Sequence, residues 1–240
     1  MIHRLLEQII QYLKGDTSYE LDPVLTGLAL AQVGSYRGSA MLRGSWRKLR
    51  LKKSNGALLI GKKVTLRCPQ MISTGRSVII EDYVTIDALS QEGVILGDNV
   101  TIAKFTTVQC TGVIRSLGVG LKIGNNSAIG AYSFLGAQGG ITIGNDVIMG
   151  PRVNFHAENH KYDNLNIPIR LQGETRQGIM IEDDCWVGAG SIFLDGVHVG
   201  TGSIVAAGSV VTKDVPAYSI VAGSPARVIK KRNNAEGIVE

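Results

Sequence analysis

From residue 181 onwards the sequence repeats itself every six residues. It reads IEDDCW, VGAGSI, FLDGVH, VGTGSI, VAAGSV and VTKDVP. The first positions are apolar and the fifth positions are small or Val; they are Ile181, Val187, Phe193, Val199, Val205 and Val211, and Cys185, Ser191, Val197, Ser203, Ser209 and Val215. An amphipathic helix needs apolar residues at a period near 3.6, so a period of six excludes one here.

The hexads instead predict short strands joined by turns. Positions five and one lie two residues apart across the repeat boundary, so both point to the same side of a strand, and we expect them inside. The Gly or acidic residue at position two is expected to take the turn, where the backbone must be permissive. Looser copies, separated by register slips, begin at Ile60, Ile80, Leu96, Ile102, Ile123, Ile129, Leu135, Ile143 and Met149.

A fixed period distinguishes two all-β architectures. The turns of a β-sandwich are spaced irregularly, roughly 8 to 12 residues apart. A solenoid repeats at one period, because each coil buries its apolar side only by stacking on the next. The 30 Gly residues and the low aromatic content of 5% also favour a structure rich in tight turns. The pattern therefore predicts a solenoid.

The net charge of +5 limits the classes of partner. Basic residues cluster at Arg43, Arg47, Lys48, Arg50, Lys52 and Lys53, and again at Lys230, Lys231 and Arg232. No zinc finger, RNP-like motif or recognition-helix pattern accompanies them, so no nucleic-acid partner is expected.

The cysteines and the apolar runs indicate the compartment. Cys68, Cys110 and Cys185 have no paired or metal-type spacing, which fits a reducing environment. Residues 1–14 carry charge throughout, unlike a signal peptide. The longest apolar stretch, VLTGLALAQV at 24–33, is far shorter than the roughly 20 residues of a membrane span. We expect a soluble cytoplasmic protein.

One stretch, at about 154–178, interrupts the repeat. The 27 residues between Val153 and Ile181 fit no hexad. They are expected to form a protruding loop, because solenoids accept insertions at their corners, and such loops often carry function. The loop contains His156 and His160. Histidine suits a general base because its ordinary pKa is near 6.5. A zinc site between these two histidines lacks an evident third ligand, so no metal is predicted.

The hexads, the loop with Asn159-His160, and the run CWVGAGSIFLDGVHVGTGSIVAAGSVVTKDVPAYSIVAGSPARVIKK resemble the hexapeptide-repeat O-acetyltransferases. The overall pattern is most similar to enzymes that acetylate bacterial exopolysaccharide or lipopolysaccharide sugars, and similar also to galactoside and maltose acetyltransferases. The resemblance covers residues 58–232. It implies a left-handed parallel β-helix of triangular section, acetyl-CoA as co-substrate, a sugar or glycan acceptor, and a homotrimer with its active sites between subunits.

The resemblance also implies roles for individual residues. His160 would be the catalytic base. His156 does not match that position and is interpreted as a substrate or subunit contact, and Asn159 and Gln138 are also predicted to contact the acceptor. Acetyl-CoA would be held by Trp186, Ala189, Ala207, Thr212, Lys213, Arg227 and Lys230, with the Ala189 backbone amide at the thioester oxygen. By analogy with a catalytic triad, and not from the resemblance, Glu158 and Asp163 are candidates to orient His160; the alternative is that these carboxylates are simply solvated. Cys185 is interpreted as an inward filler, so direct transfer is preferred over a covalent acetyl-enzyme.

The acceptor side departs from the galactoside enzymes. Where they hold the sugar with Asn and Asp in the preceding coils, this chain has Gly130 and Gln138. A sugar within a polymer or a lipid-linked intermediate therefore fits better than a small galactoside. The alternative function is a non-catalytic or zinc-binding β-helix trimer that acts as a scaffold.

Three segments are expected: an N-terminal helical or capping segment at 1–57, the β-helix at 58–217, and a C-terminal segment at 218–240. The stretch HRLLEQIIQYLK places Leu5, Leu6, Ile9, Ile10 and Leu13 on one helical face. Two interpretations stay open. This helix is either a cap over the open end of the solenoid, or an interfacial helix that acts with the basic 43–53 run at the inner membrane surface.

Overall fold

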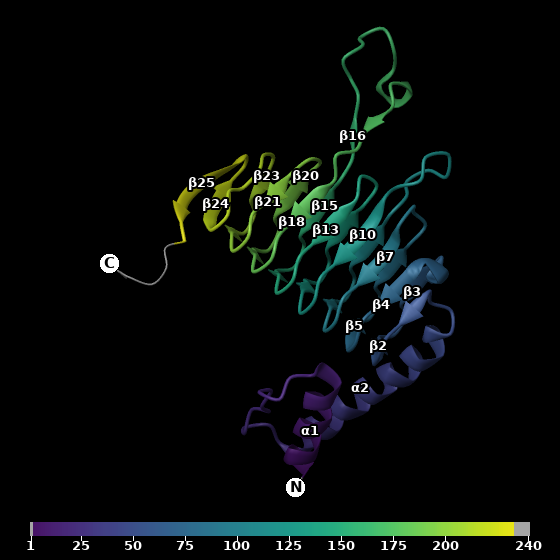
Figure 1. Ribbon diagram of the computed structural model, residues 1–240, viewed down its shortest axis with the longest axis vertical. Helices are drawn as coiled ribbons and strands as arrows, with labels where there is room; N and C mark the ends of the chain where they lie inside the picture. Colours follow the sequence, from purple (N-terminus) through teal and green to yellow (C-terminus); the bar gives the residue numbers. More distant parts are fainter. Residues whose placement is uncertain (1, 233–240) are drawn as a thin grey trace.

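We describe residues 2–232 from a computed structural model of the chain; Met1 and residues 233–240, the last part of the predicted C-terminal segment, lie outside the described residues. The chain forms a column of stacked coils with two helices at one end and a long arm projecting from its side (Figure 1). Each coil contributes one short strand to each of three sheets, which we call faces A, B and C; neighbouring strands are parallel except for the last pair of face B, which is antiparallel.

The strands follow the chain from face A to face B to face C and back to A. Face A contains β1 (Lys53–Ser54), β4 (Ile72–Thr74), β7 (Gly93–Leu96), β10 (Gly120–Ile123), β13 (Ile141–Ile143), β18 (Ile179–Ile181) and β21 (His198–Val199). Face B contains β2 (Leu58–Ile60), β5 (Val78–Ile80), β8 (Thr101–Ile102), β11 (Ala128–Ile129), β14 (Ile148–Met149), β19 (Trp186–Val187), β22 (Ile204–Val205), β24 (Ser219–Gly223) and β25 (Ala226–Lys231). Face C contains β3 (Thr65–Arg67), β6 (Thr85–Asp87), β9 (Thr107–Gln109), β12 (Phe134–Gly136), β15 (Asn154–His156), β20 (Ile192–Leu194) and β23 (Val210–Val211).

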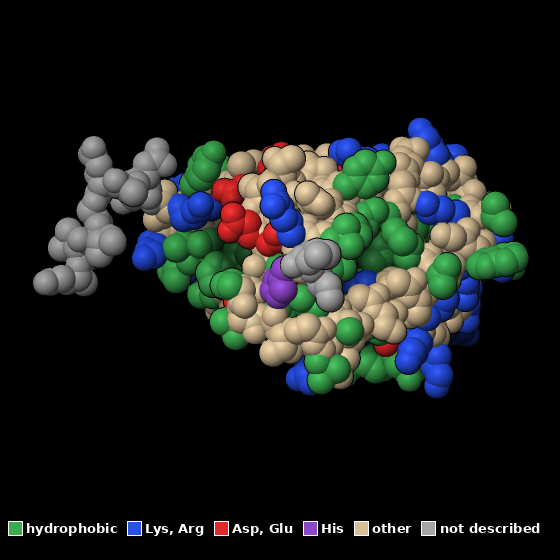
Figure 2. All heavy atoms as spheres, turned by 90° about the horizontal axis from the view of Figure 1, so that it is seen from below, with side chains coloured by type: hydrophobic (Ala, Val, Ile, Leu, Met, Phe, Trp, Pro, Cys, Tyr) green, Lys and Arg blue, Asp and Glu red, His purple; other side chains and the backbone are tan. Residues whose placement is uncertain are grey.

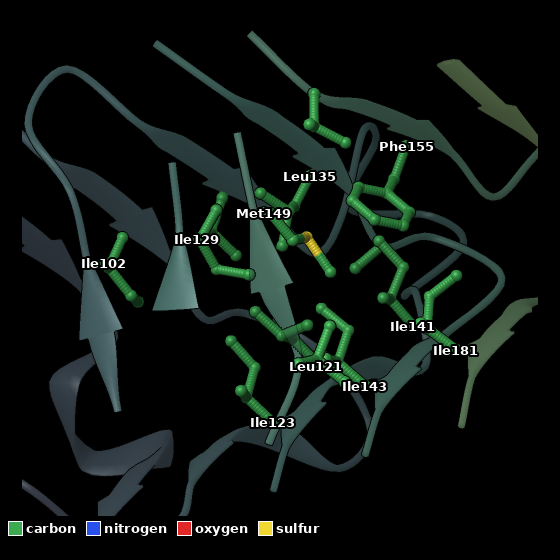
Figure 3. Packing of buried hydrophobic residues seen from close by; sticks show 14 of the residues in the cluster. Ile102, Leu121, Ile123, Ile129, Leu135, Ile141, Ile143, Met149, Phe155 and Ile181 are labelled. Carbon is green, nitrogen blue, oxygen red and sulfur yellow. The ribbon is translucent and has the colours of Figure 1, made fainter. Parts of the chain in front are cut away.

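The core is the inside of this column. All first and fifth positions of the six hexads are buried, which confirms the prediction from the repeat. Apolar side chains of the three faces meet along the axis (Figure 3). Equivalent residues pair from coil to coil, as Ile141 does with Ile179. The two largest buried side chains, Phe155 and Phe193, stack with ring centroids 4.8 Å apart.

The turns differ from the prediction in one respect. The left-handed backbone occurs at position four of the hexads, as at Asp184 (φ 56°) and Gly190 (φ 71°), and not at position two. Glycine at position two serves close packing between coils. A Cβ atom added to Gly188 would lie 2.4 Å from the Ala207 nitrogen of the next coil. The expected reason for Gly at this position, backbone freedom, was therefore wrong.

Polar side chains reinforce the corner between faces A and B. The backbone nitrogen of Asn125 donates to Asn145 Oδ1 at 2.8 Å, and that of Asn145 donates to Asp183 Oδ1 at 2.7 Å. Asn125 Oδ1 in turn accepts from the Asp98 nitrogen at 2.8 Å. This ladder satisfies turn amides that strand pairing leaves unpaired.

The open end of the column is covered by α2 (Gly27–Lys48), which begins at the N-cap Thr26. Gly44 allows the helix to approach closely, since a Cβ atom there would lie 1.7 Å from the Leu58 oxygen. Arg43 Nε donates to the Ile60 oxygen at 2.8 Å, Arg47 donates to the Val64 oxygen at 3.3 Å, and Lys48 donates to the Gly56 oxygen. These cations donate hydrogen bonds to carbonyl oxygens of the first coil, which has no further coil on its outer side to pair with them.

The first helix, α1 (Ile2–Lys14), lies beside α2 instead of over the column (Figure 1). Of its predicted apolar face, Leu6, Ile10 and Leu13 are partly buried, while Leu5 and Ile9 are exposed. Covering the column thus falls to α2, not to the helix that the sequence pattern singled out. In residues 2–232 no helix is long and apolar enough to cross a membrane.

Candidate active site

The arm leaves the column after β15 and returns at β18, at the corner between faces C and A (Figure 1). It contains the antiparallel pair β16 (Asn159–His160) and β17 (Glu174–Thr175), and a 3₁₀ turn at Ile169–Leu171. The predicted loop at 154–178 began too early. Residues 154–156 still form a column strand, because Phe155 occupies a regular inward position.

His160 lies on the arm's short hairpin, opposite Glu174. Both His160 and its neighbour Asn159 are exposed. Glu158, one of the two carboxylates expected to orient His160, is bonded to Arg176, and the other, Asp163, is exposed. The hairpin therefore holds the His160 side chain at an exposed position outside the column.

Arg176 fixes the base of the arm. Its guanidinium contacts Glu158 Oε2 through Nε at 2.8 Å and through Nη2 at 2.7 Å. The same group donates to Ser116 Oγ at 3.0 Å and to the Leu117 oxygen at 3.2 Å. Ser116 and Leu117 belong to a second excursion from the same corner, residues 110–118. A single planar cation thus joins both ends of the arm to the coil beneath it.

His156 and Gln138 lie near the foot of the arm. His156 is exposed on the outer side of face C, with its ring centroid 5.7 Å from that of Phe134. Its neighbour in the preceding coil is Gly136, where an added Cβ atom would lie 3.1 Å from Gln138 Oε1. The two predicted acceptor contacts therefore flank one glycine at the corner from which His160 projects.

The residues predicted to hold acetyl-CoA begin on face B and at the corner between faces B and C. Trp186 is exposed on face B, between Ile148 and Ile204 of the adjacent strands. Ala189 and Ala207 occupy equivalent turns of consecutive coils at the B–C corner, and the Gly208 nitrogen donates to the Ala189 oxygen at 2.8 Å. Both alanines are exposed.

The predicted phosphate-binding cations lie at the C-terminal end of the column. Lys213 and Arg227 line the same cavity, of about 250 Å³, with Val211, Asp214, Val215, Val221, Ala226 and Val228. Thr212 precedes Lys213 directly, and Lys230 follows on the same strand as Arg227, β25. The structure brings these four residues to one end of the molecule, where cations are exposed to solvent.

Within one chain, however, the predicted site is divided. The arm with His160 starts at the C–A corner, whereas Ala189 and Ala207 lie at the B–C corner. Face C separates the two corners. The arm also projects away from the column instead of folding back over it (Figure 1). Within the single chain, the predicted base and the two predicted donor-binding alanines therefore lie at different corners of the column.

The two buried cysteines are poor nucleophiles. Cys185 is buried, and its thiol faces the Gly200 oxygen at 3.4 Å. Desolvation by burial raises the pKa of Cys185 and raises the pKa of Cys110 to about 12. A thiol needs its thiolate form to attack a thioester, so this environment agrees with the interpretation of Cys185 as a filler.

A metal centre and a second cavity are the remaining candidates for a site within residues 2–232. No group of three or more His, Cys, Asp or Glu side chains in this range is arranged to hold a metal ion. A larger cavity, of about 740 Å³, lies between the end of α1 and the A–B corner and is lined by residues that include Lys14, Arg76 and Asp98. None of the predicted site residues lines it.

Sequence reasoning missed the clamp at Arg176 and the 110–118 excursion. The excursion has a visible signal, since no hexad begins between Ile102 and Ile123, a longer gap than one coil requires. Arg176 carries no such signal. Its role depends on Glu158 and Ser116, which are 18 and 60 residues away in the chain.

Comparison with known proteins found matches over parts of the chain. The sequence profile described as "Hexapeptide repeat of succinyl-transferase" matches residues 77–103, 120–150 and 178–213. A Schizosaccharomyces pombe protein named as a putative acetyltransferase is 44% identical over 95 residues, which are 39% of this chain and 44% of that protein. A tetrahydropyridine-dicarboxylate N-acetyltransferase of Staphylococcus aureus is 53% identical over 58 residues, 24% of each chain. The matches thus span less than half the length of these curated relatives.

Solved structures share the fold over most of the chain. AntD, an N-acyltransferase from Bacillus cereus, was solved as a point mutant in complex with dTDP-4-amino-4,6-dideoxyglucose and coenzyme A. It superposes with a TM-score of 0.53 at 20% identity, over 80% of this chain and 90% of that one. AntD with dTDP and 3-hydroxybutyryl-CoA gives a TM-score of 0.51 at 22% identity, over 80% and 88%.

The fold and the repeat define a left-handed parallel β-helix with a corner arm, which confirms the predicted fold class. Over the matched segments the chain is similar to the hexapeptide-repeat family and to proteins named as acetyltransferases.

Proposed function

We propose that this chain is an acetyl-CoA-dependent O-acetyltransferase that transfers acetyl to a sugar hydroxyl, with His160 as the general base. Two observations support acyl transfer. The relatives are named as acetyltransferases, and the AntD structures contain coenzyme A or an acyl-CoA. AntD also contains a sugar nucleotide, which supports a sugar acceptor. We place the acceptor in exopolysaccharide or lipopolysaccharide biosynthesis and the enzyme in the cytoplasm, both on the pattern of the sequence.

The separation of His160 from Ala189 and Ala207 within one chain is the observation that carries the mechanism. Two chains side by side would bring the C–A corner of one to the B–C corner of the other, and three such contacts close a ring. The arm supports this assembly because Tyr162, Leu165, Ile169 and Leu171 are exposed on it, Leu165 to 95%. Apolar side chains on a projecting arm favour burial against a neighbour.

The proposed chemistry needs few groups. His160 accepts the proton of the sugar hydroxyl as the hydroxyl oxygen attacks the thioester carbonyl carbon. The Ala189 backbone amide donates to the oxygen that becomes negatively charged. Collapse of the intermediate expels the coenzyme A thiolate, which takes the proton from the imidazolium. Acetyl ester and free thiol are the products, and no covalent enzyme intermediate forms.

The first experiment follows thiol release from acetyl-CoA in the presence of acceptor glycans. His160→Ala should lower kcat by roughly 10² to 10⁴, the usual contribution of a general base. His198→Ala is the matched control. His198 is also exposed, but it lies on face A and is bonded to Glu182 at 2.7 Å, so turnover should stay near that of the wild type. Equal turnover of the His160→Ala and wild-type enzymes would remove the base assignment.

A second experiment tests the shared site. His160→Ala and Ala189→Arg chains, each inactive alone, are co-expressed with different tags and the mixed assemblies purified. If each site takes its arm from one chain and its donor groove from the next, about a quarter of the wild-type activity returns in a random mixture. No recovery in verified mixed trimers would show that each chain holds its own site. Absence of acetyl-CoA binding by the wild-type protein would instead favour the scaffold alternative.

A further inference from the structure

One side of α2 is apolar and unpaired within the described residues. Leu42, Trp46 and Leu49 are exposed to 70%, 78% and 82%. Their spacing of four and three residues places them on one side of the helix and its C-cap. The column lies on the opposite side, where Gly44 packs against Leu58 and Arg43 bonds the Ile60 oxygen. We call Leu42, Trp46 and Leu49 the α2 outer face.

The surroundings of the α2 outer face are strongly basic. Between Asp22 and Glu81 the sequence contains eleven Lys and Arg residues and no Asp or Glu. Arg50, Lys52 and Lys53 follow α2 directly and are exposed, and no carboxylate of residues 2–232 forms an ion pair with them. Figure 2 views this end of the molecule and shows Lys and Arg side chains beside exposed hydrophobic ones at its right-hand side.

These features restrict the partner. A second copy of the same face would bring like charges together without carboxylates to balance them, which costs free energy. A nucleic acid would use the cations but would leave Leu42 and Leu49 in water. An anionic lipid surface uses both groups, because Leu and Trp enter the interface between headgroups and acyl chains while Lys and Arg contact the headgroups.

We propose that the α2 outer face, with Arg50, Lys52 and Lys53, docks on an anionic bilayer surface. Because α2 lies across the end of the column, docking would leave the column extending away from the bilayer (Figure 1). The proposal does not depend on the acetyltransferase activity. A parallel trimer, as proposed above, would add avidity, since all three outer faces would point to the same side.

The test is co-sedimentation of the full-length protein with two kinds of vesicle, phosphatidylcholine alone and phosphatidylcholine with phosphatidylglycerol. We expect binding to the anionic vesicles that weakens at high salt. Reversing Arg50, Lys52 and Lys53 to Glu should lower the partition coefficient by roughly 100-fold or more. Reversing Arg115, Lys161 and Arg170, three exposed cations on the arm's side of the molecule, is the matched control and should change it little.

The apolar part is tested separately. Leu42→Ser, Trp46→Ser and Leu49→Ser together should reduce binding at least tenfold by the transfer free energy of the lost groups. Ile114→Ser, at an 85% exposed site on the 110–118 excursion, should not. An unchanged unfolding midpoint would establish that the triple variant folds. In a Trp186→Phe background, Trp46 fluorescence should shift to the blue on binding and be quenched by brominated acyl chains.

Three results would overturn the proposal: no binding to anionic vesicles at low salt, binding that both sets of variants leave unchanged, or an unshifted Trp46 spectrum in the bound state. Tighter binding to DNA or RNA than to vesicles, lost in the charge-reversed variant, would assign the face to nucleic acid instead. Catalytic failure of the enzyme would leave these readouts unaffected.

Discussion

The column and the arm are adjacent in the sequence but differ in burial: the column buries its apolar side chains, whereas the arm exposes several of its own. In the column, each coil repeats the inward positions of the last, so side chains such as Phe155 and Phe193 have neighbours on every side. In the arm, Leu165 and His160 are exposed, and the segment is joined to the column mainly through Arg176. The well-packed side chains thus lie in the repeated part, whereas the proposed catalytic base lies where the repeat is broken.

The largest expected contrast is in stability. Phe193→Ala should lower the free energy of unfolding by about 3 to 5 kcal/mol, because it opens a cavity beside Phe155 that the surrounding strands cannot close. Leu165→Ala, at the tip of the arm, should change it by less than about 0.5 kcal/mol. Denaturant unfolding of both variants measures the difference. Equal losses would mean that the arm is part of the cooperative core.

The next contrast separates positioning from folding. Arg176→Gln should leave the column's unfolding midpoint nearly unchanged but lower kcat by up to roughly 100-fold, because the arm loses its anchor to Glu158 and Ser116. Hydrogen exchange should rise in residues 157–177 and not in β20. Arg170→Gln, at an exposed position on the same arm, is the control. A uniform rise in exchange throughout the column would contradict a local role.

A smaller effect is expected at the A–B corner as the pH falls. Asp98 accepts from the Arg76 backbone nitrogen and pairs with its guanidinium at 2.8 Å, and these bonds hold the pKa of Asp98 below its usual value. A lowered folded pKa stabilises the protein above the ordinary carboxyl pKa near 4, and the stabilisation disappears as the pH falls through the folded value. Asp98→Asn should therefore cost up to about 1 kcal/mol at pH near 7, and progressively less as the pH falls from the ordinary carboxyl pKa through the folded pKa of Asp98. A pH-independent difference would refute the ionic contribution.

The smallest effect is expected at Cys185. Ser occupies the same position of the next hexad, at Ser191, where its hydroxyl donates to the Gly188 oxygen at 2.8 Å. Cys185→Ser should thus be accepted in the column, and turnover should stay within a factor of about two because the buried thiol takes no part in transfer. Kinetics with acetyl-CoA and a thiol-alkylation assay check this. A loss as large as that of His160→Ala would indicate a covalent intermediate.

The sequence determined the column because every hexad repeats the same pattern of inward-facing first and fifth positions. Each apolar first position and small fifth position is consistent only with an inward strand side chain, and all twelve in the last six hexads are buried. The repeat also located the arm, since the break in period is visible in one dimension. Its start was misplaced by three residues, because Phe155 keeps the inward pattern while its flanking residues do not.

Only the tertiary structure decided how segments that are distant in the sequence are placed relative to one another. Three such relations depend on how the coils stack. The helix α2 covers the column, Arg176 joins Glu158 to Ser116, and His160 and Ala189 lie at different corners. A periodic sequence fixes which side of a strand faces inward, because that follows from the two-residue alternation of the backbone. It does not fix which non-repeating side chains meet across coils, because those contacts arise from three-dimensional distances that no local pattern encodes.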